Sequence, residues 1–174
     1  MQPSPRFAGK STTGPGQICR LVGGVLCGNH PVGHERGTSC GEHLLGGTSD
    51  GNFQTLGNWY TNVTQTTAAS ALPGASDIAT FNAQGTVTNA ISTLGQSLAL
   101  QGMLFNSNAS GNITLGTLND FVVTLGTAGI SVQAGSGSHT LNSGVTVGST
   151  QSWTNNAGSN KVLTVAGNVT LSAT

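Results

Sequence analysis

The chain has 174 residues, a formal net charge of zero and only 6% charged residues, whereas an ordinary soluble domain carries about 25%. So little charge argues against nucleic-acid binding, which needs clustered lysine and arginine to replace phosphate counterions. It also argues against helical bundles, whose outer faces are usually charged. The length suffices for one domain with a core of useful size.

The first part of the chain, residues 1–47, differs from the rest. It holds six of the ten charged residues and all three cysteines, and it shows neither strand alternation nor a helical period. We therefore predict an irregular N-terminal segment. Its one apolar stretch, residues 18–26, is interrupted by Arg20 and lacks the basic start of a signal peptide, so no signal peptide is predicted.

Cysteine and histidine, the residues that zinc prefers, recur at short intervals near the end of this segment. Their overall spacing matches no standard zinc finger, and no regular structure is expected around them. We predict no metal site here and no cofactor for the chain. The residues concerned are Cys27, His30, His34, Cys40 and His43.

Residues 48–174 form the second predicted region, a set of short alternating segments separated by turn sequences such as NSNASGN and GTAG. Threonine suits half-exposed strands, and glycine and asparagine suit tight turns. The region is therefore predicted to be all-β. The expected strands are 78–81, 86–91, 98–105, 113–115, 121–125, 130–133, 139–141, 145–147, 162–165 and 169–171.

Two architectures fit such strands, a parallel β-helix and an antiparallel β-sandwich. Threonine, serine and asparagine can stack in successive rungs as hydroxyl and amide ladders, whereas charged side chains would repel at a spacing of about 4.8 Å. A solenoid therefore explains the missing charge, and a right-handed parallel β-helix is the predicted fold, with the sandwich as the alternative. At roughly 20–25 residues per rung, residues 85–174 would form about four turns.

Two motifs add a resemblance to a known family. GNW at residues 57–59, a polar stretch and PGASDIATF at 73–81 resemble the rung-start motif of bacterial autotransporter-associated β-strand repeat proteins. A tryptophan at 153 followed by the L-x-V-x-G-x-V pattern of residues 163–169 is similar to their repeat unit. The resemblance covers residues 50–174. It implies an exported right-handed β-helix with a surface role and no catalytic residues to carry over.

The motif residues have structural roles in this interpretation. A tight turn precedes Trp59, whose ring closes the end of the core, and Asp77 accepts a local backbone N–H and starts a strand. An alternative interpretation makes Trp59, Tyr60 and Trp153 an aromatic platform for sugars. The predicted structural-motif residues are Gly57, Asn58, Trp59, Pro73, Gly74, Asp77, Phe81 and Trp153.

An enzymatic interpretation depends on Asp77 and Asp120, which are 43 residues apart, or about two rungs. Stacked on one face, they would lie roughly 9–10 Å apart, at the upper limit for an inverting glycosidase pair. Polysaccharide-cleaving sites also need basic residues, and only Lys161 and His139 are available in this region. We therefore predict that the chain is not an enzyme.

The predicted function is an exported, non-catalytic structural or adhesin-like module, secreted or associated with the outer membrane at the cell surface. Expected partners are surface glycans or other cell-surface molecules and neighbouring rungs of the same protein, with no nucleic acid and no membrane span. The runner-up is a carbohydrate-binding β-sandwich, which strand direction would distinguish. The alternating strand pattern is still present at residues 169–174 and has no polar cover, so we expect further rungs to follow and the isolated chain to self-associate end to end.

Overall fold

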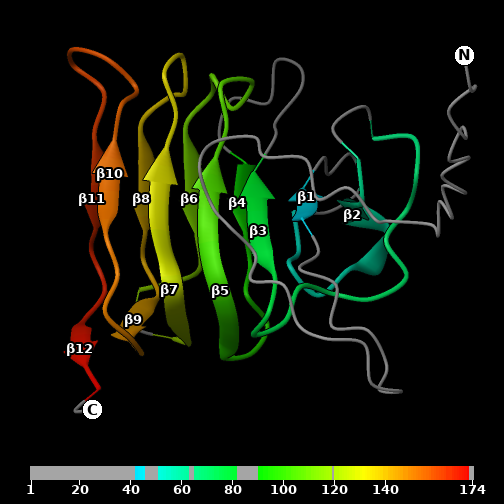
Figure 1. Cartoon of the computed structure of the whole chain (residues 1–174), viewed down its shortest axis with the longest axis horizontal. Coiled ribbons are helices and arrows are strands. Elements are labelled where there is room, and N and C mark those ends of the chain that lie inside the picture. The colour runs from blue at the N-terminus through cyan, green and yellow to red at the C-terminus, as the bar shows by residue number, and fades with distance from the viewer. Residues whose placement is uncertain (1–41, 46–50, 63–64, 82–89, 119, 173–174) are drawn as a thin grey trace, which may run out of the picture. The chain divides into compact units, whose positions relative to one another are not determined.

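The computed structural model describes residues 42–45, 51–62, 65–81, 90–118 and 120–172, which all belong to one of the two units of the chain, His34–Thr174. These residues form short strands and one turn of 3-10 helix (Figure 1). The elements are β1 (Glu42–Leu45), the 3-10 helix (Leu56–Asn58), β2 (Trp59–Tyr60), β3 (Ile78–Phe81), β4 (Ala90–Ser92), β5 (Leu98–Phe105), β6 (Ile113–Leu115), β7 (Val122–Val132), β8 (His139–Leu141), β9 (Gly144–Val147), β10 (Trp153–Asn155), β11 (Leu163–Val165) and β12 (Val169–Leu171).

Strand pairing in the described part of the chain is parallel throughout, except where β1 meets β2. One sheet has the order β12-β9-β7-β5-β3-β1-β2, with β10 beside β7, and the other has the order β11-β8-β6-β4. The predicted parallel β-helix is therefore confirmed, with about three turns instead of four. The alternative β-sandwich is wrong, because from β3 onward strands that follow each other in the chain lie on different faces and do not form hairpins.

Each rung contributes to three faces, because the larger sheet bends along its strands. The first half of β7 pairs with β9, and its second half pairs with β10. The first face therefore contains β9, β12 and the first halves of β5 and β7, and the second contains β3, β10 and the second halves of β5 and β7. The third face is β4, β6, β8 and β11. Paired residues in the stack are 22 positions apart at Val123 and Val145 and 27 apart at Met103 and Ile130.

The bend between the first two faces requires glycine. Gly102 in β5 pairs with Gly129 in β7, directly after the point where the register of the two strands shifts. Gly129 has a φ of 62°, and a Cβ there would collide with the backbone oxygen of Ser152 in the next rung. A side chain at this corner would therefore separate the rungs that the corner holds together.

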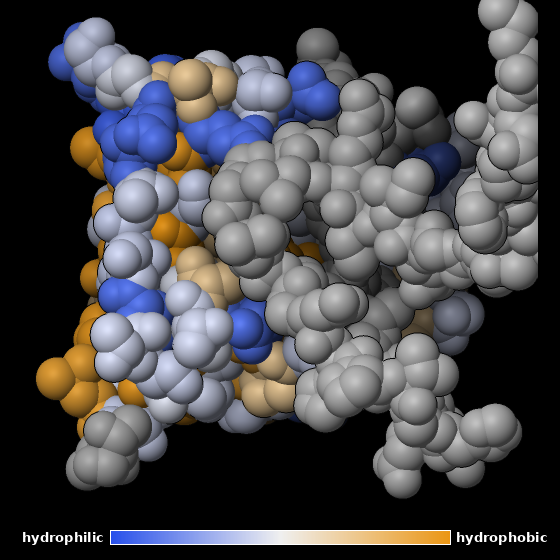
Figure 2. All heavy atoms as spheres, in the orientation of Figure 1, coloured by the Kyte–Doolittle hydropathy of each residue, from blue (hydrophilic) through white to orange (hydrophobic). Residues whose placement is uncertain are grey.

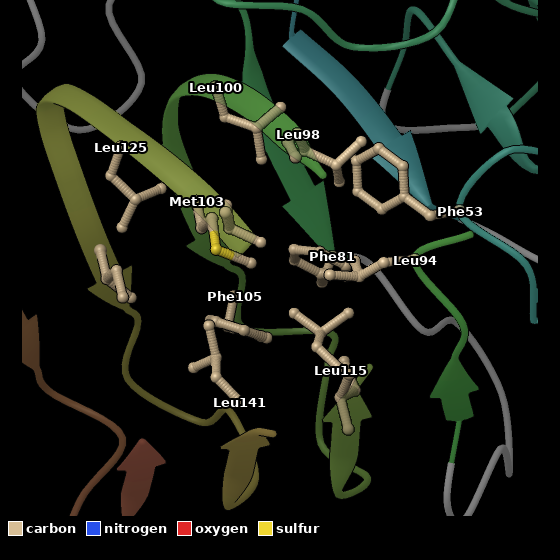
Figure 3. Packing of buried hydrophobic residues seen from close by; sticks show 14 of the residues in the cluster. Phe53, Phe81, Leu94, Leu98, Leu100, Met103, Phe105, Leu115, Leu125 and Leu141 are labelled. Carbon is tan, nitrogen blue, oxygen red and sulfur yellow. The ribbon is translucent and has the colours of Figure 1, made fainter. Parts of the chain in front are cut away.

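The core is a set of side-chain columns that run along the inside of the stack. Alternate residues of the strands are buried, as in β6 and β8, because successive side chains of a strand point to opposite faces. Phe81 stacks on Phe105, with ring centroids 4.8 Å apart. Leucines from different rungs, such as Leu100 and Leu125, point into the same interior (Figure 3). Burial of each large apolar side chain contributes about 1.5–3 kcal/mol.

The end of the core beside β3 is closed by two aromatic residues. Trp59 and Phe53 are both buried, and their rings meet edge to face with centroids 4.6 Å apart. The Trp59 ring also lies 6.4 Å from that of Phe81, the first aromatic residue of the inner column. The Trp59 Nε1–H donates to the Phe53 backbone oxygen at 2.8 Å, so the indole is buried with its polar group satisfied.

Several strand boundaries differ from the sequence predictions. β1 lies within residues 1–47, which were predicted to be irregular, and it pairs with β3. β2 and β10 were not predicted either. The segments 121–125 and 130–133 form the single strand β7. Most of the predicted strand 86–91 and the rest of residues 1–47 lie outside the described residues.

Candidate functional site

The outward positions of the first and third faces carry columns of threonine. Each threonine is the centre of a short triplet whose outer residues point into the core, so its hydroxyl points away from the core. The residues are in direct register between rungs, which places equivalent hydroxyls about 4.8 Å apart. The columns are Thr124, Thr146 and Thr170 on the first face and Thr114, Thr140 and Thr164 on the third.

Amide side chains connect successive rungs at the turns and corners. Five such hydrogen bonds join residues that are each 26 positions apart. Neutral amides can bond in this way along the stack, whereas charged groups in the same columns would repel. The five bonds are Gln101 to Thr127, Gln133 to Ser107, Asn112 to Ser138, Asn142 to Gly116 and Gln151 to Leu125.

His139 occupies an inward position of β8, in register with Ile113 and Leu163. It is 1% exposed, and its ring stacks on Phe105 with centroids 4.3 Å apart. The Ile113 N–H donates to its Nδ1 at 3.3 Å, which assigns the proton of the neutral ring to Nε2. Burial, assisted by the positive charge of Lys161, lowers the pKa of His139 to about 4.

The hydroxyl of Ser136 lies 2.8 Å from Nε2 of His139, a contact that resembles a nucleophile and its base. The Nε2–H donates to Ser136 Oγ, and that hydroxyl in turn donates to the Ala109 backbone oxygen at 3.2 Å. Ser136 is also buried. Both groups are therefore saturated with structural hydrogen bonds inside the stack, so this pair is suited to holding rungs together and not to attacking a substrate.

The two aspartates considered for catalysis do not stack. Asp77 precedes β3 on the second face, where its backbone oxygen accepts from the N–H of Gln101 at 2.8 Å. Asp120 precedes β7 on the first face. The stacked arrangement considered from the sequence is therefore wrong, because 43 residues do not correspond to a whole number of rungs in a stack with three faces. Asp77 Oδ2 instead accepts the N–H of Gly74 at 2.9 Å and closes a turn before β3.

The interpretation of Trp59, Tyr60 and Trp153 as one sugar platform is also wrong. Trp59 is 0% exposed, so its ring offers no free face. Tyr60 lies with it in β2, whereas Trp153 lies in β10, beyond β1, β3, β5 and β7 in the sheet. Trp153 is 36% exposed and donates its Nε1–H to Gln151 Oε1 at 2.8 Å.

The other motif residues lie in turns and in the core near β2 and β3. Gly57 lies in the 3-10 helix, and the buried Asn58 donates its amide to the Asn52 backbone oxygen at 2.9 Å. Pro73 is buried directly before the turn that Gly74 and Asp77 close, and Phe81 ends β3 inside the core. The structure thus brings the N-terminal motif residues together around the closed end of the stack, and it places Trp153 apart from them.

The sequence predicts an uncovered strand pattern at residues 169–174, and the structure shows which side chains are exposed in this rung. In Figure 2, hydrophobic residues gather along the side of the molecule where β11 and β12 lie. Leu171, Val169 and Trp153 are large exposed apolar residues of this rung. In each strand triplet the first and third residues point inward, and this alternation is visible in the sequence. For Trp153 the inward position follows only from the pairing of β10 with β7.

Within the described residues, no group of three or more cysteine, histidine, aspartate or glutamate side chains could hold a metal ion. Four of the five candidate zinc ligands lie outside these residues, and of His43 only the backbone, in β1, is described. No helix in the described part of the chain is long and apolar enough to cross a membrane. No protein-family model, curated protein or solved structure matches the chain.

Proposed function

We propose that the chain is an exported, cell-surface structural or adhesin-like β-helix module without catalytic activity. The observation that carries this proposal is the pair of outward threonine columns in register on a stack whose rungs are cross-linked by neutral amides. Regularly spaced hydroxyls can donate and accept hydrogen bonds along an extended polar surface. The corresponding ligand class is a surface glycan, which presents hydroxyls in repeating units.

The roles of the reactive side chains support a non-catalytic function. His139 and Ser136 hydrogen-bond to each other inside the core, and Asp77 closes a turn. These groups serve the fold, whereas an active site holds such groups where a substrate can reach them. The polysaccharide-cleaving β-helix remains the competing function, because it would share the same architecture.

The export and surface location in this proposal rest on the resemblance of the GNW and PGASDIATF motifs to autotransporter-associated repeat proteins. The low charge and the threonine-rich strands agree with such a passenger-like module. We propose a secreted or outer-membrane-associated location. Antibodies against the chain should label intact cells of its source, and external protease should remove the label. Labelling only after lysis would contradict the proposed location.

Binding and cleavage can be tested together. The 174-residue chain is incubated with immobilised polysaccharides and mucin-type glycans, and we expect retention on a subset of them without release of new reducing ends. Thr146→Val and Thr140→Val remove one hydroxyl from the first and third faces at nearly constant volume. Weaker retention by one variant, with an unchanged circular dichroism spectrum, would identify the binding face. New reducing ends would show that the chain is an enzyme.

A further inference from the structure

The first face has a hollow at Gly144, on the side of the stack. Val122 pairs with Gly144, and Asn168 follows in the next rung, directly before β12. These positions point outward, but glycine has no side chain, so a hollow of about 170 Å³ remains between its neighbours. The hollow opens away from the core, so a rung stacked on β12 would not cover it. Its lining residues are Val122, Gly144, Val145, Thr146, Asn168 and Thr170.

The backbone does not require glycine at position 144. Its φ is not positive, and a Cβ there would lie 3.3 Å from Cγ2 of Val122 and 3.6 Å from the backbone oxygen of Asn168. At Gly129 and Gly167, by contrast, a Cβ would collide with the backbone oxygen of the neighbouring rung. The missing side chain at Gly144 therefore leaves free space on the first face and does not serve a close approach of two backbones.

The lining of the hollow combines an apolar wall with hydroxyl groups. Val122 is 39% exposed, so its side chain offers apolar surface to a ligand. Thr146 and Thr170 are direct neighbours in adjacent rungs, and each outward hydroxyl can both donate and accept a hydrogen bond. Ligand sites in proteins typically combine apolar surface with a few placed polar groups in this way.

Charge restricts the kind of ligand that the hollow can hold. Among the described residues, no charged side chain lines it. Asp120 is the charged residue nearest to Val122 in the chain, two positions before it, and a carboxylate would repel an anion. An anionic ligand would therefore lose its hydration without gaining a partner of opposite charge. The lining favours a neutral ligand.

We propose that the hollow holds one pyranose ring of a neutral glycan, a step that rests on the proposed glycan-binding function. A pyranose ring carries C–H groups on its faces and hydroxyls at its edge. It can therefore contact Val122 and hydrogen-bond to Thr146 and Thr170 at the same time. The hollow is smaller than the about 300–1,000 Å³ of pockets that enclose drug-sized ligands. The neighbouring sugar units therefore lie outside it, along the column that continues to Thr124.

The ligand class is tested by measuring dissociation constants of the full 174-residue chain on immobilised polysaccharides. The neutral probes are mannan, dextran and xylan, and the anionic probes are polygalacturonate and heparin. We expect binding to at least one neutral probe, and binding to the anionic probes that is at least about 10-fold weaker, because an unpaired charge is disfavoured in the hollow.

The position of the ring is tested by filling the hollow. Gly144→Ala places a methyl group in the space that the ring would occupy, and we expect binding to the neutral probe to weaken about 10-fold or more. The matched control is Gly57→Ala, because a Cβ there would meet nothing within 4 Å and Gly57 lies in the 3-10 helix, outside the first face. It should bind like the unmodified chain.

Val122→Thr tests the apolar wall without filling the hollow. Valine and threonine are similar in volume and both suit strands, so the fold should be kept. Replacing a methyl group by a hydroxyl should weaken contact with the C–H face of the ring and reduce the affinity about 3-fold. Circular dichroism checks the fold of both variants. If Gly144→Ala lost its β-structure, Val122→Thr alone would decide.

The possible results separate this proposal from the proposed function. Weaker binding of Gly144→Ala and Val122→Thr, with unchanged binding of Gly57→Ala, supports the subsite. Equal binding by the unmodified chain and both hollow variants, or tighter binding to the anionic probes, would overturn the subsite while supporting glycan binding itself. Retention of the unmodified chain on none of the five polysaccharides would overturn both.

Discussion

The imidazole of His139 occupies a position that a leucine or isoleucine fills in the neighbouring rungs. The ring is retained there in its neutral form, because one nitrogen accepts the Ile113 N–H and the other donates to Ser136. A charged ring would lose the first of these bonds and would lie in a core of low polarity. The sequence shows only that a histidine is present at this position. Its burial follows from the alternation of β8, in which the first and third residues point into the core.

Acidification should therefore destabilise the fold through His139. Its pKa is about 4 in the folded chain and 6.5 when exposed, so between these values the unfolded chain binds the extra proton. Stability is fully present above pH 6.5 and falls as the pH approaches 4. We expect a loss of about 2 kcal/mol after allowing for solvent screening. Urea unfolding between pH 7 and pH 4 measures it.

The control for this prediction is His139→Leu, which matches the aliphatic column. It leaves the Ile113 N–H without its acceptor and should lower stability at pH 7 by about 1–3 kcal/mol. Since the other histidines and the carboxyl groups remain, the difference in pH dependence between the two chains isolates His139. An equal loss of stability in both chains on acidification would contradict its assignment as the sensitive group.

Gly129 is a second residue whose role depends on one contact. Gly129→Ala places a methyl group against the Ser152 backbone oxygen at a positive φ, and we expect a destabilisation of about 3 kcal/mol. Gly57→Ala is the control, because its Cβ would meet nothing within 4 Å. It should change stability by less than about 1 kcal/mol. Thermal unfolding of both variants measures these effects. Equal losses would indicate that the corner at Gly129 is not tightly constrained.

Among the elements, the strands that the sequence predicts well share one pattern. β3, β5, β6, β8 and β12 have the predicted bounds, because apolar alternation is bounded there by glycine, asparagine or serine. β10, with the sequence WTN, has only one apolar residue, and β2 has two residues, so neither shows a period. The sequence predicts two strands, 121–125 and 130–133, in place of β7, because Gly126 and Gly129 are typical of a turn. In the structure these glycines lie at a corner within one strand.

The columns that make up the candidate surface were harder to predict than the strands. Threonine and amide ladders follow from composition, but the residues that share a column depend on the exact length of every turn. From β3 onward, paired residues are 22 to 27 positions apart, and this spacing differs between the faces, so the residues of each column are determined separately. For this reason the sequence could not show that Asp77 and Asp120 lie on different faces, or that Trp59 and Trp153 lie at different ends of the sheet.

The register itself explains why the strands carry so few charges, and this can be tested with two lysines. Thr140 and Thr164 are direct neighbours on the third face. Thr140→Lys and Thr164→Lys should each cost little, but together they should lose about 0.5–1 kcal/mol more than the sum of the single losses. Urea unfolding at low and high salt measures this coupling, which salt should reduce.

The control pair combines Thr140→Lys with Thr170→Lys, which lies on the first face. Because these two positions belong to different columns, their effects should add. Coupling of equal size in both pairs would mean that general charge, and not stacking in register, disfavours lysine in these strands.

At the scale of the whole molecule, the stack is close to one-dimensional, since each rung contacts mainly its two neighbours. Stability should then vary along the stack, because the end near Trp59 and the rung of β10, β11 and β12 differ in burial. The strands β5 and β7 have neighbours on both sides and contain most of the fully buried leucine, isoleucine and phenylalanine side chains of their faces. In the 174-residue chain, opening should therefore begin at β10, β11 and β12.

Hydrogen exchange on the 174-residue chain tests this order. We expect the amides of β10, β11 and β12 to exchange at least about 100-fold faster than those of β5 and β7, because opening the last rung breaks one set of pairings and exposes side chains that are already partly exposed. Uniform protection across the rungs would instead indicate that the whole stack opens as one cooperative unit.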